Sequence, residues 1–125
     1  MRGAVLDAGA LIAIERGNRR MQALLDEAHV AGAELTIPAG ALAQSWRGTP
    51  RQARLARLLR LANVKVAPLD EPTAKAAGVL CGTAGTNDVV DASVVLAARR
   101  RAQTVITSDA DDLRRLDGRL RMVTI

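Results

Sequence analysis

Residues 4–14, AVLDAGALIAI, decide the fold class of this chain. The apolar run Ala4-Val5-Leu6 has the length of a short buried strand and stops at Asp7. Beyond Asp7, the apolar residues Leu11 and Ile14 recur at the spacing of a helix. The segment is therefore predicted to be a buried strand followed at once by a helix, with a carboxylate at the junction.

The same alternation of strand and helix continues to the end of the chain. Further strands are predicted at residues 35–37, 64–67, 104–107 and 122–125. Helices are predicted through Met21 and Ala28, from Pro38 through Trp46, and over residues 51–61, 71–81, 88–101 and 109–116, with a loop at 82–87. Strands that alternate with helices of this length predict an α/β fold with a central parallel sheet of about five strands and helices on both faces.

The composition is that of one folded domain over residues 1–125, with 49% apolar and 25% charged residues. One Trp and no Phe or Tyr make the stacking of nucleobases on aromatic side chains a minor mode of recognition. The single Cys81 excludes an intramolecular disulfide and a cysteine-based zinc site. Because no signal-peptide pattern opens the chain and no apolar run reaches the ~20 residues that span a bilayer, we expect a cytoplasmic protein without a membrane partner.

The net charge of +5 is carried almost entirely by arginine, since Lys65 and Lys75 are the two lysines among eighteen basic residues. Arginine binds phosphate oxygens through two parallel hydrogen bonds, which suits a nucleic-acid partner. A GC-rich genome favours arginine codons and produces the same bias. Composition alone does not choose between these two explanations.

Two aspartates follow apolar strands directly, Asp7 after Val5-Leu6 and Asp109 after the segment 105–108. The carboxyl ends of parallel strands meet at one edge of a sheet, where open α/β folds place their ligands. Asp7 and Asp109 are therefore expected to lie close together. The alternative is that each residue only caps the helix that follows it, because Asp is a favoured N-cap.

A third acid, Asp91, lies within the apolar stretch 89–96. A buried carboxylate requires a partner. Asp88 is one helical turn earlier, so both acids can face the same site, and a divalent cation would relieve their repulsion. The alternative is that Asp88 caps the helix and Asp91 interacts with its first amides.

Carboxylates without histidine or cysteine are hard oxygen ligands that select Mg²⁺ or Mn²⁺ over zinc. The one histidine, His29, lies on an amphipathic helix and is interpreted as a surface or packing residue. Acids around a Mg²⁺ ion can orient and help deprotonate a water molecule beside a phosphodiester. The acidic residues thus favour nuclease chemistry.

Three motifs together resemble the PIN-domain ribonucleases, and within them the VapC toxins of bacterial toxin–antitoxin pairs. They are Leu6-Asp7-Ala8-Gly9-Ala10-Leu11, Asp88-Val89-Val90-Asp91-Ala92, and Val105-Ile106-Thr107-Ser108-Asp109 with Asp112-Leu113 following. The likeness spans essentially the whole chain. It implies an α/β/α sandwich, a Mg²⁺- or Mn²⁺-dependent endoribonuclease acting on RNA, a cognate antitoxin that inhibits it, and a homodimer.

Carried over residue by residue, the family's first, third and fourth acids fall on Asp7, Asp91 and Asp109, with Asp88 and Asp112 as auxiliary acids. The family's second acid, a Glu, is replaced by Gln44. The Gln44 amide keeps an oxygen that can reach a metal ion or its water, but it brings no negative charge. Weaker metal affinity is therefore expected, unless Asp88 supplies the missing charge.

Arginines on two segments, 47–60 and 99–101, can hold RNA phosphates or acidic groups of an antitoxin, although solvated helix faces have the same pattern. Trp46 can stack on a base or fill an interface, and packing in the core is the expectation for it.

Two rival interpretations remain. One is a catalytically weak PIN module that binds RNA or antitoxin without cutting, and Gln44 favours it.

The other rival is a phosphoryl-transfer domain of the receiver or haloacid-dehalogenase type, which also places Asp after parallel strands. A receiver requires paired acids near the first strand and a late lysine, but Asp7 has no acidic neighbour and Lys75 is the last lysine. A dehalogenase-type phosphatase requires a second Asp where Gly9 stands. The motifs fit both poorly.

Overall fold

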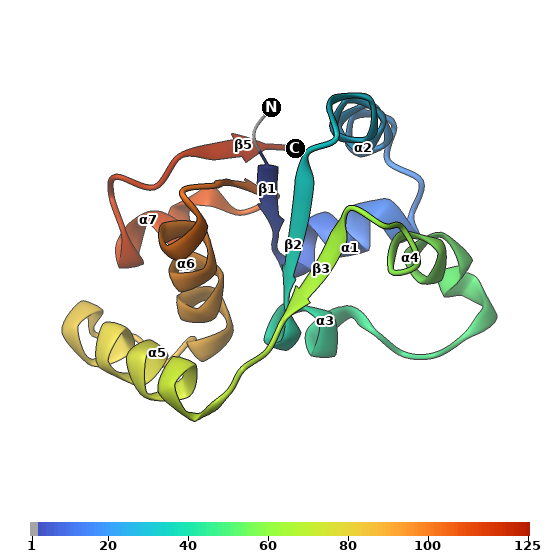
Figure 1. The fold of residues 1–125 in the computed structure, drawn as a ribbon. Helices are drawn as coiled ribbons and strands as arrows, with labels where there is room; N and C mark the ends of the chain where they lie inside the picture. Colours follow the sequence, from blue (N-terminus) through green and yellow to red (C-terminus); the bar gives the residue numbers. More distant parts are fainter. Residues whose placement is uncertain (1–2) are drawn as a thin grey trace.

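The computed structural model describes residues 3–125, which form a five-stranded sheet between two layers of helices (Figure 1). Every pair of neighbouring strands is parallel, and their order is β3-β2-β1-β4-β5. The strands are β1 (Gly3–Leu6), β2 (Glu34–Pro38), β3 (Val64–Ala67), β4 (Thr104–Thr107) and β5 (Met122–Thr124). The prediction of an α/β/α sandwich with a parallel sheet of about five strands is confirmed.

Two groups of helices cover the sheet. One face carries α1 (Ala8–Glu15), α2 (Arg19–Ala31), α3 (Ala39–Ser45) and α4 (Ala53–Leu58), and the other carries α5 (Glu71–Ala84), α6 (Val89–Arg101) and α7 (Ala110–Leu116) (Figure 1). Within residues 3–125, no helix is both long enough and apolar enough to cross a membrane.

The central strands are buried because helices cover them on both sides. Side chains of β1, β4, α1 and α6 fill the core, and Val5, Leu6, Leu11, Val95 and Ile106 are at most 1% exposed. Burial of a leucine or isoleucine of this kind stabilises the fold by about 2 kcal/mol. The core is aliphatic, as the near absence of aromatic residues requires, and it holds the carboxyl ends of β1 and β4 side by side.

Several helix boundaries differ from the sequence predictions. The helix predicted to end at Cys81 continues to Ala84, so the first half of the predicted loop 82–87 is helical. Gly82 lies on an exposed stretch where glycine weakens a helix without breaking it. Gly85, at φ 73°, takes the left-handed conformation that ends the helix. Pro38 was predicted to begin a helix, but it is the last residue of β2.

The segment after α3 contradicts the prediction that Trp46 packs in the core. Trp46 follows the end of α3 and is 39% exposed. The buried Gln52 side chain fixes this segment: its amide donates to the Ser45 carbonyl at 2.6 Å, and its oxygen accepts from the Arg47 and Gly48 N–H groups at 2.7 and 3.1 Å. These bonds satisfy the backbone just beyond the helix and leave the indole at the surface.

The predicted basic helix over residues 51–61 is shorter than expected. A 3₁₀ turn, η1 (Pro50–Gln52), precedes α4, which ends at Leu58. The side chains of Leu55 and Leu58 point into the core, and those of Arg54 and Arg57 point outward. His29 lies exposed on α2, in agreement with its interpretation as a surface residue.

Candidate functional site

Asp7 lies where β1 ends and α1 begins, and its side chain is nearly buried, with 6% of the residue exposed. One carboxylate oxygen, Oδ1, accepts a hydrogen bond from the Ala10 N–H at 2.8 Å. Asp7 therefore caps α1, as the capping alternative expects, but the cap does not exclude a second role. A helix cap uses only part of the acceptor capacity of a carboxylate, and the rest stays available to a ligand.

Asp109 follows β4, which pairs with β1 through Leu6 and Ile106, so the two acids emerge from neighbouring strands. The buried Thr107 lies between them. Its hydroxyl oxygen accepts from the Asp109 N–H at 2.9 Å, and the same side chain lies close enough to the Asp7 carboxylate to lower its pKa. Asp109 occupies the N-cap position of α7, but its side chain forms no capping hydrogen bond. Its exposed carboxylate is therefore not used to cap the helix.

Asp88 and Asp91 lie at the start of α6. The Asp91 N–H donates to Asp88 Oδ1 at 3.0 Å, which makes Asp88 the N-cap that the alternative interpretation anticipated. Asp91 is half-buried and its carboxylate accepts no amide hydrogen bond among the described residues, so the corresponding alternative for Asp91 is not observed. Its side chain instead lies within electrostatic range of three other acids, Asp7, Asp88 and Asp112.

The pKa values report this crowding. Burial and then the Asp88 charge, with smaller contributions from Asp112 and Asp7, raise the pKa of Asp91 to about 7. The pKa of Asp7 is also raised, first by burial and further by Asp109, although bonds from Thr107 and the Ala10 amide oppose the shift. Repulsion by Asp109 raises the pKa of Asp112. Asp7, Asp88, Asp91, Asp109 and Asp112 thus form one electrostatically linked group, the acidic cluster.

The acidic cluster borders a hollow of about 210 Å³ between the start of α6 and α7. Its lining consists of Thr86, Asn87, Asp88, Asp91, Asp112, Arg115 and Leu116. Thr107, Asn87 and Arg115 were not predicted at this site from the sequence. A threonine at the end of a strand and an asparagine before a helix have many ordinary structural functions, so no sequence signal singled them out.

Gly9 allows the close approach of α1 to the loop after β4. A Cβ atom at position 9 would lie 2.1 Å from Ser108 Oγ, 3.2 Å from Ser108 Cβ and 3.4 Å from Asp7 Oδ1. Ser108 Oγ ends an exposed side chain that can rotate away, but the contact with Ser108 Cβ would still require a small shift. Glycine at position 9 therefore eases the close approach at the edge where Asp7 and Asp109 emerge.

The acidic cluster fits a hard divalent cation better than any other ligand. Its donors are carboxylate oxygens, and the pKa values of Asp7, Asp91 and Asp112 are raised although Arg115 lies beside Asp112. Within residues 3–125, however, no three histidine, cysteine or carboxylate side chains are close enough to form a complete coordination shell. Repulsion between like charges opposes such a shell, and a bound cation would remove that repulsion.

Gln44 is exposed on the last turn of α3 and makes no side-chain hydrogen bond to the acidic cluster among the described residues. It lies one helical turn after Gly40, whose Cβ position would be 3.5 Å from Val90 at the start of α6. The face of α3 that carries Gly40 therefore packs toward the helix that carries Asp91. Gln44 itself is exposed, and its place beside the acidic cluster stays a prediction.

Comparisons with known proteins match almost the whole chain. The family model described as the PIN domain matches residues 4–119. No curated protein matches the sequence significantly.

Similar solved structures include several two-protein complexes. They include VapBC2 from Rickettsia felis bound to a promoter DNA fragment, with 15% identity, a TM-score of 0.72 and 98% of each chain covered. A toxin–antitoxin complex from Klebsiella pneumoniae has 19% identity and a TM-score of 0.71, covering 97% of this chain and 96% of the other. VapBC-5 from Mycobacterium tuberculosis has 23% identity and a TM-score of 0.58 over 100% of both chains. At these identities the likeness establishes a shared fold.

Proposed function

This chain belongs to the PIN domain family, and from that premise we propose that it is a Mg²⁺- or Mn²⁺-dependent endoribonuclease that acts as the toxin of a toxin–antitoxin pair. Family membership also removes the receiver and phosphatase alternatives. The observation that carries the proposal is the acidic cluster, in which acids from three distant segments raise one another's pKa values.

Each acid has a distinct task in this proposal. Asp7, Asp91 and Asp109 hold the cation, and Asp88 and Asp112 are auxiliary ligands that add negative charge. Thr107 positions Asp7 and Asp109 relative to each other through its hydroxyl. A bound cation supplies Lewis-acid chemistry to the phosphodiester and lowers the pKa of a nearby water.

Gln44 is proposed to orient water or the substrate from α3. Its amide oxygen can accept a hydrogen bond, but it cannot take up a proton as a Glu would. The surrounding arginines, including Arg115 beside Asp112, offer positive charge to the phosphates of an RNA strand.

An antitoxin partner and a homodimer complete the proposal. The solved structures from Rickettsia felis and Klebsiella pneumoniae are toxin–antitoxin assemblies, and this chain shares their fold. We place the protein in the cytoplasm, where its RNA substrate and antitoxin would be found. The second candidate is a PIN module that binds RNA or antitoxin without efficient cleavage, which Gln44 in place of an acid favours.

Single-turnover cleavage of RNA by the purified chain, with and without Mn²⁺ and free of antitoxin, tests the proposal. Cleavage that requires Mn²⁺ and is abolished in Asp7→Asn supports the nuclease, since Asn preserves the helix cap and removes the charge. Asp26→Asn, on the exposed part of α2, is the matched control and is expected to cleave at the wild-type rate. Metal-independent RNA binding without cleavage supports the second candidate.

A further inference from the structure

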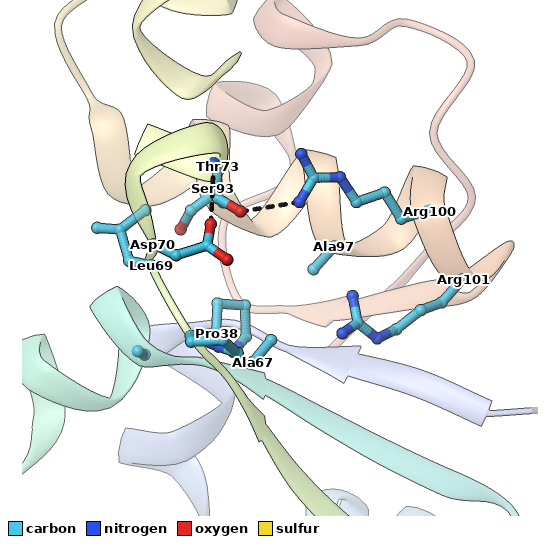
Figure 2. Close-up of a pocket in the computed structure, with 11 residues that line it drawn as sticks. Pro38, Ala67, Leu69, Asp70, Thr73, Ser93, Ala97, Arg100 and Arg101 are labelled. Atoms are coloured by element: carbon cyan, nitrogen blue, oxygen red, sulfur yellow. Dashed lines mark hydrogen bonds between the residues drawn. The ribbon is translucent and has the colours of Figure 1, made fainter. Parts of the chain in front are cut away.

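A second hollow, of about 400 Å³, lies between the ends of β2 and β3, the start of α5 and the second half of α6 (Figure 2). It shares no lining residue with the hollow at the acidic cluster. We call it the arginine hollow. Its floor is made of small and apolar residues, among them Pro38, Ala67 and Ala97. Asp70 and Thr73 at the start of α5 form one wall, and Arg100 and Arg101 reach over the space from α6 (Figure 2).

The three consecutive arginines at the end of α6 differ in what they contact. Arg99 is engaged outside the hollow, where its Nε lies 2.9 Å from Asp117 Oδ2. Arg100 is held in the hollow by a hydrogen bond to Thr73 Oγ1 at 2.9 Å. Arg101 forms no ion pair within residues 3–125. The hollow therefore contains one fixed guanidinium and one that is open to a ligand.

The charge balance of the hollow suits an anion with a single negative charge. Asp70 caps α5 through its bond from the Thr73 N–H at 3.0 Å, and its carboxylate opposes part of the arginine charge. The positions Asp70, Arg100 and Arg101 together carry one net positive charge. A phosphate within an RNA chain carries one negative charge, whereas a terminal phosphate carries ≈ −1.5 to −2.

One end of the arginine hollow, at Pro38 and Ala67, lies at the edge of the sheet where Asp7 and Asp109 emerge, and the two arginines reach toward it from the end of α6 opposite to Asp91. Asp7 follows β1, Pro38 ends the neighbouring strand β2 and Ala67 ends β3, so the hollow extends from about 5 Å to about 10 Å away from β1 across the sheet. A single RNA strand a few nucleotides long can reach both places. The volume exceeds that of a phosphate group, and the apolar floor offers a surface to the attached nucleoside.

We propose that the arginine hollow is a substrate subsite that binds one nucleotide of single-stranded RNA flanking the cleavage position, with its phosphodiester against Arg100 and Arg101 and its nucleoside on the floor at Ala67. This inference rests on the proposed function, because it takes RNA as the substrate.

Fluorescence anisotropy of a short labelled single-stranded RNA with the full chain, in EDTA to prevent cleavage, tests the subsite. Arg101→Gln should weaken RNA binding by about tenfold, the scale of one lost charged hydrogen bond, and should lower the slope of log affinity against log salt by about one. Arg99→Gln removes the same charge two residues away and should change the affinity less than twofold. Equal losses in the two variants would overturn the subsite and indicate general electrostatic attraction.

Two further variants leave the arginines intact. Ala67→Leu fills the floor and should weaken binding, whereas Ala74→Leu, on an exposed position of α5, should not. Asp70→Asn preserves the helix cap but removes a negative charge, so RNA should bind more tightly. An unchanged RNA affinity of Ala67→Leu would overturn the proposal. The proposal would also be overturned if Arg101→Gln changed the molar mass of the protein in solution but not its RNA affinity. That result would assign this face to contact between copies of the chain.

Failure of the subsite and failure of the proposed function give different results. If the wild type cleaves RNA in a metal-dependent reaction but Arg101→Gln binds RNA as tightly as the wild type, the subsite alone is overturned. Absence of cleavage by the wild type, with the predicted ranking of RNA affinities, would overturn the nuclease proposal and leave the subsite supported. Competition with inorganic phosphate distinguishes a site for a nucleotide of RNA from a site for free phosphate. Displacement of RNA by inorganic phosphate at a concentration equal to that of the RNA would contradict recognition of a nucleotide.

Discussion

Replacing Asp91 by Asn should stabilise the protein in the absence of metal. The Asp91 carboxyl has a pKa raised to about 7 by burial and by the Asp88 charge. Ionisation at neutral pH therefore opposes folding, and an amide of the same shape removes that penalty. A residue that is costly to the fold is expected where its charge serves a ligand.

The size of the effect follows from the shift. Moving a pKa from 3.8 to about 7 corresponds to roughly 4 kcal/mol at 1.36 kcal/mol for each pH unit. Asp91 is half-exposed, so solvent screening reduces this value, and Asn also loses a favourable interaction with the start of α6. We expect a net gain of about 1–2 kcal/mol, which raises Tm by roughly 3–8 °C in a chain of this size.

The pH dependence has a definite sign. A carboxyl group whose folded pKa is raised contributes stability in its protonated form, which is fully present below 3.8 and is lost as pH rises through about 7. The advantage of Asp91→Asn should therefore be largest above pH 7 and should nearly vanish near pH 4. Mg²⁺ should stabilise the wild type and leave Asp91→Asn almost unaffected.

Thermal unfolding in EDTA, followed by the fluorescence of Trp46 across this pH range, measures the effect. Asp26→Asn is the control because it removes one negative charge from exposed α2 and makes the same change in net charge. A lower Tm for Asp91→Asn than for wild type at pH 7.5 would refute the reasoning. So would an equal gain at pH 4, since a gain without pH dependence cannot come from ionisation.

Three other predictions use the same protein. Affinity for Mn²⁺, measured by calorimetry, should fall as pH is lowered through about 7, because Asp91 must lose its proton to bind a cation. A constant affinity from pH 8 to 5 would argue against Asp91 as a ligand. Gln44→Glu should raise Mn²⁺ affinity if residue 44 lies beside the ion, and no change would place it outside the coordination shell. Gln52→Leu should lower the free energy of unfolding, measured by urea denaturation, by about 2–3 kcal/mol, because two backbone N–H groups and the buried Ser45 carbonyl lose their partner. A loss below about 0.5 kcal/mol would show that water replaces the amide.

The strands and their common edge were predictable because short apolar runs and helical periodicity agree along the chain. Asp7 and Asp109 could be assigned to one edge because parallel strands share the direction of their carboxyl ends. The sequence analysis treated capping and ligand binding as alternatives for Asp7. The structure shows that the Asp7 side chain caps α1 and also belongs to the acidic cluster.

Other features depend on tertiary contacts that a local pattern does not contain. Trp46 was expected in the core because it is aromatic, yet its exposure is set by Gln52, six positions later, which is polar and buried. The arginines at 99–101 look identical in sequence and are distinguished by contacts with Asp117 and Thr73. Gln44 was identified from the family pattern, and its position relative to the acids remains a prediction.

Binding of Mn²⁺ to the wild type and to the three variants Asp7→Asn, Asp91→Asn and Asp109→Asn, counted by electron paramagnetic resonance, tests the central claim most directly. If these acids share a cation, each variant should lose Mn²⁺ binding while keeping a cooperative unfolding transition, and Asp26→Asn should bind as the wild type does. Binding of Mn²⁺ with wild-type affinity by all three folded variants would contradict the claim.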